Sequence, residues 1–248
     1  MPLLVTALGL SLLGSCGGLL VASSLLLFTD RVRTRLVPWL VSYAVGALLG
    51  VALLALLPEA LAALAPAPVF GTLLAGILTF FVLVKLVLLR HCHTDECQVH
   101  GATAPLVFVG DAFHNFMDGA IICTAVLTSV PLGVNTAIAV AAHEIPQEVG
   151  DVAVLLAAGY SRGGALLLNV ATGASGIAGA LVAYAAVDFV PGLRPFVLAF
   201  SSASLLYIAM SDLIPDLHRG QLDANAVRQV VLIVAGIATI VAFERFVG

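Results

Sequence analysis

The sequence predicts an all-α integral membrane protein whose one domain, residues 1–248, crosses the bilayer eight times. Hydrophobic residues make up 61% of the chain and charged residues 10%, and the mean hydropathy is +1.15. Soluble domains carry about 25% charged residues. In lipid the backbone must satisfy its own hydrogen bonds, which favours helices. The predicted spans are about 3–28, 36–63, 69–90, 104–129, 133–159, 164–188, 193–216 and 226–247.

Composition and cysteine placement exclude several other classes of protein. The chain has no basic patch, so we expect the lipid bilayer and no nucleic acid as its partner. Cys16 and Cys123 lie in hydrophobic segments and the other two cysteines in one short loop, so no disulfide framework is predicted. The first apolar segment has no basic start, which favours a spanning helix over a cleaved signal.

The distribution of basic residues predicts the orientation of the chain. With the N-terminus outside, one side of the membrane carries Arg194 and Arg245, and the other carries eight basic residues: Arg31, Arg33, Arg35, Lys85, Arg90, Arg162, Arg219 and Arg228. Loops rich in Lys and Arg stay in the cytoplasm. We therefore expect both termini on the non-cytoplasmic side of the plasma (cell inner) membrane. The oligomeric state is open, with a homodimer as one option.

Two spans end in similar motifs that suggest an internal repeat. The second span ends Leu57-Pro58-Glu59 and the seventh ends Ile214-Pro215-Asp216, and the predicted topology runs these helices in opposite directions. Spans 1–3 and 6–8 would then form an inverted pair around spans 4 and 5, a 3+2+3 arrangement, and transporters often place their site at such a repeat interface. Two unrelated proline-terminated helices would explain the motifs equally well.

The fourth and fifth spans each carry a polar run near their centres. The residues concerned are Asp111, His114, Asn115 and Asp118 in the fourth span and His143, Glu144, Gln147, Glu148 and Asp151 in the fifth. Residues four apart share a helix face, and a charge at the bilayer centre costs at least ~2.5–3.5 kcal/mol. A divalent cation bound between the two helices would compensate that cost.

The mixture of ligand types favours a borderline transition metal. Imidazole together with carboxylate suits Zn²⁺ first, and leaves Fe²⁺, Mn²⁺ and Cd²⁺ open. Asn115 and Gln147 offer neutral oxygens, while Asp111 and Asp151 could orient the ligands or relay the ion. A second candidate is the loop 91–103, where metal capture on the cytosolic side and a plain polar loop are both open; its donors are His91, Cys92, His93, Cys97 and His100.

Other functions fit parts of the same pattern. His143-Glu144-x-x-Gln147 is one residue short of the zincin motif, so an intramembrane zinc metallohydrolase is an alternative. Channel-like metal conductance through the same site is another. A buried ion-paired network that only holds the helices together, or a purely structural membrane protein, completes the set.

The runs Gly110–Gly119 and His143–Asp151 closely resemble the signature helices of the ZIP (Zrt/Irt-like) metal transporters, in particular the branch with a His-Glu-x-Pro-His-Glu fifth helix. The resemblance extends to eight spans, outside termini, the proline-acidic motifs and Asn169 early in the sixth span. It implies that a divalent metal, zinc first, is cargo rather than a cofactor and enters the cytosol by an elevator-like alternating-access movement. Carried over by position, the implied ligands are His114, Asn115, Asp118, His143, Glu144 and Gln147, with Glu148 tuning the site.

Two positions depart from that branch. Gln147 replaces a histidine, which should weaken the site or change its metal preference. Val51 and Ala55 stand where members of the branch often carry Asp and His in the second span. The resemblance therefore predicts that an accessory site or release path is missing here, and leaves one or two metal positions open.

Overall fold

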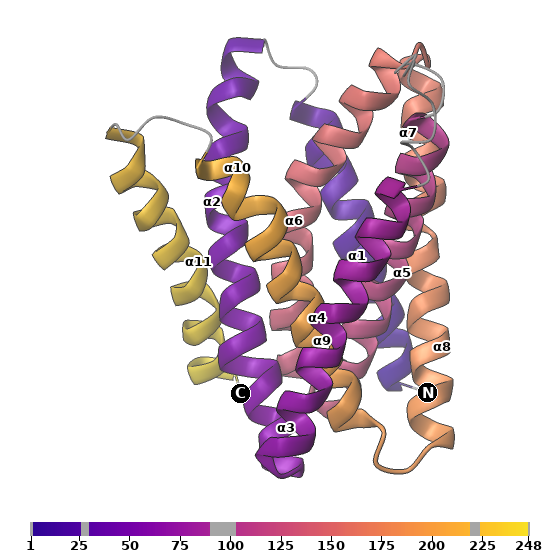
Figure 1. Cartoon of the computed structure of the whole chain (residues 1–248), viewed down its shortest axis with the longest axis vertical. Helices are drawn as coiled ribbons and strands as arrows, with labels where there is room; N and C mark the ends of the chain where they lie inside the picture. The colour runs from indigo at the N-terminus through magenta and orange to yellow at the C-terminus, as the bar shows by residue number, and fades with distance from the viewer. Residues whose placement is uncertain (1, 26–29, 90–102, 219–223, 248) are drawn as a thin grey trace.

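The computed structural model describes residues 2–25, 30–89, 103–218 and 224–247, and these residues are helical apart from short connections (Figure 1). The long helices run roughly along one axis, and α1 begins at the same end of the bundle where α11 ends. The helices are α1 (Pro2–Leu25), α2 (Asp30–Val51), α3 (Leu57–Ala63), α4 (Pro66–Leu89), α5 (Thr103–Thr128), α6 (Val130–Ala157), α7 (Arg162–Gly173), α8 (Ser175–Phe189), α9 (Arg194–Tyr207), α10 (Ile214–His218) and α11 (Ala224–Val247).

Six stretches of the described residues are long and apolar enough to cross a membrane. They are Pro2–Ser24, Arg35–Ala63, Pro66–Lys85, Arg162–Phe189, Arg194–Leu213 and Ala226–Phe246. The all-helical membrane class predicted from composition is thus confirmed. Helices α5 and α6 are also long, but the polar runs that they carry keep them out of this set. The count of eight spans therefore stays a prediction.

The two proline-acidic motifs share a local deformation. A π-helical turn, Ala52–Leu56, joins α2 to α3 just before Pro58, and a second, Ile208–Leu213, joins α9 to α10 just before Pro215. Proline has no N–H to give to the carbonyl four residues earlier. A shift to hydrogen bonds between residues i and i+5 is one way for a helix to pass such a point.

The helices pack into two groups. Helix α1 lies against α5, α6 and α8, whereas α2 lies against α11 and α4 against α9. Helix α2 also packs along α6 and so joins the groups, and buried Val51 and Ala55 belong to the apolar cluster at this junction. A hydrogen bond from Asn135 Nδ2 of α6 to Glu244 Oε2 of α11, 2.5 Å long, also joins the two groups.

Glycine makes the closest helix contacts within each group. A Cβ on Gly119 of α5 would overlap the carbonyl oxygen of Gly176 in α8, and one on Gly179 of α8 would overlap that of Phe116. Gly46 of α2 approaches the carbonyl of Ile233 in α11 equally closely. Small residues allow such approaches between membrane helices.

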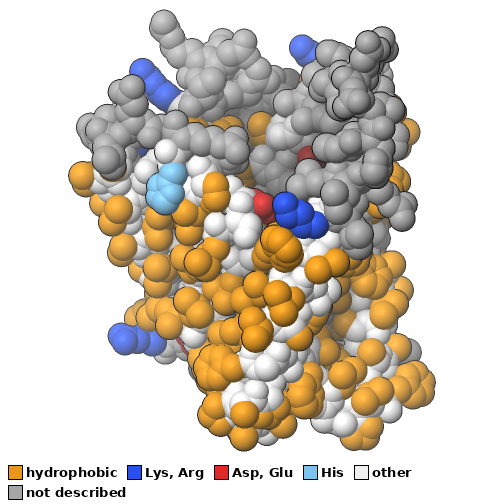
Figure 2. Space-filling view, viewed as in Figure 1, with side chains coloured by type: hydrophobic (Ala, Val, Ile, Leu, Met, Phe, Trp, Pro, Cys, Tyr) orange, Lys and Arg blue, Asp and Glu red, His pale blue; other side chains and the backbone are white. Residues whose placement is uncertain are grey.

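The outer surface is apolar, as a lipid-facing surface must be. Figure 2 shows hydrophobic side chains over most of the visible face of the described part. Large side chains are exposed on α4 and α11 in particular, including Phe70, Leu74, Leu78, Val227 and Val230. This distribution supports an integral membrane protein.

Candidate metal site

Helices α5 and α6 bring two imidazoles and two carboxylates together at one point. The four-residue group consists of His114, Asp118, His143 and Glu144, and one donor atom from each lies within 4.8 Å of the other three. His143 is 1% exposed, Asp118 1% and Glu144 0%, so the group is closed to solvent except at the side chain of His114, which is 17% exposed.

The donor atoms have the spacing of a tetrahedral coordination shell. His114 Nε2 lies 2.9 Å from His143 Nε2, 3.5 Å from Asp118 Oδ2 and 3.5 Å from Glu144 Oε1. His143 Nε2 lies 3.2 Å from Asp118 Oδ2 and 3.8 Å from Glu144 Oε1. Zinc bonds of ~2.0–2.2 Å in tetrahedral geometry separate neighbouring donors by about 3.3–3.6 Å, close to these values.

The tautomer of His143 is set by its own helix. His143 Nδ1 lies 3.2 Å from the carbonyl oxygen of Ala139, which can only accept a hydrogen bond, so Nδ1 carries the proton. The lone pair of Nε2 then faces the other three donors, which is the arrangement that a metal-ligating histidine requires.

Several buried oxygen atoms at the group have no hydrogen-bond partner among the described residues. They include Asp118 Oδ1 and both carboxylate oxygens of Glu144. A buried polar atom without a partner costs about 1–3 kcal/mol. Two carboxylates carry two negative charges, so a dication would satisfy both the oxygens and the charge.

Amide side chains surround the group on α5, α6 and α7. Asn115 Nδ2 and Gln147 Nε2 both donate to Asp111 Oδ1, at 2.9 and 3.1 Å. Asn169 Nδ2 of α7 donates to Glu148 Oε2 at 2.5 Å. All of these residues are buried except Gln147, which is half-buried.

The predicted site residues thus fall into three sets. Four of them form the group, and Asp151 lies half-buried one turn beyond Gln147 on α6. Five more lie in two hydrogen-bonded sets, one of Asp111, Asn115 and Gln147 and the other of Glu148 and Asn169. Pro146 sits within α6 and leaves the carbonyl of residue 142 without its usual backbone donor. The predicted metal-capture loop at 91–103 lies outside the described residues but for its final residue, Thr103, where α5 begins.

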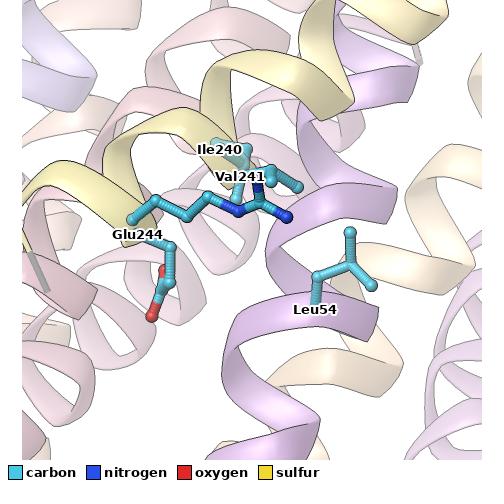
Figure 3. Close-up of a pocket in the computed structure, with 5 residues that line it drawn as sticks. Leu54, Ile240, Val241 and Glu244 are labelled. Atoms are coloured by element: carbon cyan, nitrogen blue, oxygen red, sulfur yellow. The ribbon is translucent and has the colours of Figure 1, made fainter.

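Sequence reasoning did not single out the Asn135–Glu244 pair. Each is a polar residue within an otherwise apolar span, and that placement was the available signal. Glu244 lines a cavity of about 240 Å³ together with Leu54, Ile240, Val241 and Arg245 (Figure 3). No member of the four-residue group lines this cavity.

The fold and site define a helical membrane protein with a buried histidine–carboxylate group between two adjacent helices. Residues 89–244 match the family described as ZIP Zinc transporter. The chain is 35% identical over 223 residues to Zinc transporter ZIP13 of Pongo abelii, covering 84% of this chain and 67% of that protein. It is 31% identical over 262 residues to Zinc transporter ZIP13 of Homo sapiens, covering 84% and 71%. The chain belongs to the ZIP zinc transporter family.

Another relative matches over a shorter length. Zinc transporter ZIP4 of Homo sapiens is 41% identical over 110 residues, covering 44% of this chain and 17% of that protein. Members of this family are transporters rather than enzymes. Membership of this family therefore argues against the metallohydrolase alternative. It confirms the prediction of a metal transporter from the sequence.

Proposed function

We propose that the protein carries zinc across the membrane into the cytosol through the four-residue group, by alternating access. The observation that carries this proposal is the convergence of two imidazole nitrogens and two carboxylate oxygens, from the middles of α5 and α6, at the spacing of a zinc shell. His114, Asp118, His143 and Glu144 bind the ion. Asn115, Gln147 and Glu148 influence how tightly the ion binds but are not among its ligands.

The proposed direction rests on topology. Eight crossings place both termini on one side, and the common end of α1 and α11 in Figure 1 supports an even number of crossings. The excess of basic residues predicted for the opposite side assigns that side to the cytoplasm. The matching π-helical turns before Pro58 and Pro215 support the inverted repeat of spans 1–3 and 6–8.

The two packing groups suggest how access alternates. Helices α1, α5, α6, α7 and α8 contain the site, and close glycine contacts between α5 and α8 bind them together. The second group faces them mainly through α2 and the π-helical turn that follows it, where the buried apolar cluster includes Val51 and Ala55. An apolar contact surface allows the site-bearing group to slide against α2 as a unit, in the elevator-like manner, and the hydrogen bond from Asn135 to Glu244 would have to break in that movement.

The test is metal uptake into proteoliposomes loaded with a fluorescent chelator, comparing Zn²⁺, Fe²⁺, Mn²⁺ and Cd²⁺. We expect saturable zinc uptake that His143→Ala and Asp118→Ala abolish. His218→Ala is the matched control, because His218 is an exposed histidine of α10 outside the group. Uptake that survives in both site variants would refute the site.

The remaining predictions need separate measurements. Labelling of a cysteine placed at each terminus, from outside intact cells, tests whether both termini lie outside. Fluorescence imaging tests the plasma-membrane location. The homodimer is tested by the mass of the detergent-solubilised protein.

A further inference from the structure

The side chain of Gln147 extends from α6 to a carboxylate of α5. Its Nε2 donates to Asp111 Oδ1 at 3.1 Å, and Asn115 Nδ2 donates to the same oxygen at 2.9 Å. Asp111 is 5% exposed, and its Oδ2 has no hydrogen-bond partner among the described residues. Two amides thus converge on one oxygen of a buried carboxylate.

The chemistry of this contact fixes the orientation of the Gln147 amide. An ionised carboxylate only accepts hydrogen bonds, so the NH₂ group and not the carbonyl oxygen must face Asp111. An NH₂ group has no lone pair for a cation. In this orientation Gln147 acts on Asp111 as a donor, and a hydrogen bond to a charged group is stronger than one between neutral groups.

The contact also joins the two helices that carry the proposed ligands. Gln147 is one turn from His143 on α6, and Asp111 is one turn before His114 on α5. A bond between these positions fixes how the two helices are placed along and around each other. The spacing between the imidazoles of His114 and His143 depends on that placement.

Building on the proposed function, we infer that Gln147 is a positioning residue that clamps α5 to α6 through Asp111, and is not a ligand of the transported zinc. The clamp needs one amide donor and one carboxylate acceptor, on whichever helix each stands. Exchanging the two groups should therefore preserve it.

The experiment compares two double variants of equal net charge. Asp111→Asn with Gln147→Glu exchanges the amide and the carboxylate, whereas Asp151→Asn with Gln147→Glu places two carboxylates face to face. Asp151 is a suitable control because it lies one turn beyond Gln147 on the same helix. We expect the exchanged variant to keep zinc uptake and the zinc dissociation constant within about threefold of the unmodified protein, and the control to lose at least about tenfold in each.

Two results would overturn the inference. Equal behaviour of the two double variants would show that no specific pair exists. Tighter zinc binding in the exchanged variant than in the unmodified protein would identify position 147 as a ligand, because a carboxylate there binds zinc better than an amide does.

A single substitution gives an independent reading if the double variants do not fold. Gln147→Met keeps the side-chain length and removes both amide atoms. We expect a lower apparent Tm with a zinc dissociation constant within about threefold of the unmodified value, and a tenfold weaker affinity with unchanged Tm would refute the clamp. Zinc binding and Tm are measured on purified protein, whereas uptake is measured in proteoliposomes. The clamp can therefore be refuted while the proposed transport function holds, and the transport function can be refuted while the clamp holds.

Discussion

The contact between α5 and α8 allows the sharpest test of how packing supports the site. In Gly119→Ala, the added Cβ would overlap the carbonyl oxygen of Gly176 and lie 2.6 Å from its carbon. Carbon atoms in contact are ~3.5–4.0 Å apart, so α5 and α8 must move apart by about 1 Å. Overpacking of this kind costs about 1–3 kcal/mol. We expect the apparent Tm in detergent to fall by roughly 2–12 °C.

Gly110→Ala is the matched control on the same helix. A Cβ at Gly110 meets no atom within 4 Å, so the substitution should stabilise a helix interior by up to about 1 kcal/mol. Gly119 follows Asp118 directly, so displacing α5 also moves a proposed ligand, and we expect zinc uptake to fall about tenfold in Gly119→Ala and not in Gly110→Ala. Equal Tm values for the two variants would refute the packing argument.

Three further substitutions test individual hydrogen bonds by thermal unfolding. Glu244→Ala leaves the buried amide of Asn135 without its acceptor and should cost about 1–3 kcal/mol, whereas Glu244→Gln retains an acceptor; equal losses would contradict this. Asn169→Ala removes the described donor to Glu148 and should cost a similar amount, together with slower zinc uptake; an unchanged Tm would show that another group replaces it. Ser175→Ala removes a 2.5 Å bond to a carbonyl of α5 and should cost only about 0.5–1.5 kcal/mol, less than Gly119→Ala; a larger loss would reverse the proposed ranking.

Uninterrupted apolar runs made several helices predictable from the sequence. The predicted spans 69–90 and 226–247 match α4 and α11 to within three residues, because length and hydropathy alone define a membrane helix. The predicted span 164–188 covers most of α7 and α8, which meet at Ala174. No proline marks that position, and composition carries no information about such a break.

The site was predictable in its residue types and less so in its contacts. Spacing along one helix shows which side chains share a face, so His114 and Asp118 could be paired from the sequence. The rotation of α5 against α6 depends on packing with α1, α2 and α8, which sequence spacing does not encode. The bond from Gln147 to Asp111 is therefore a structural finding, although both residues were candidates.

The choice of amides around the carboxylates explains how the site stays able to bind a cation. The described hydrogen-bond donors to Asp111 and Glu148 include Asn115, Gln147 and Asn169, none of which carries a charge. A lysine or arginine would satisfy the same oxygens but would also cancel their charge and repel a dication. Neutral amides lower the cost of burying a carboxylate without adding a charge of their own. The remaining charge can then be neutralised by the ion, which the protein must bind in passing and release again.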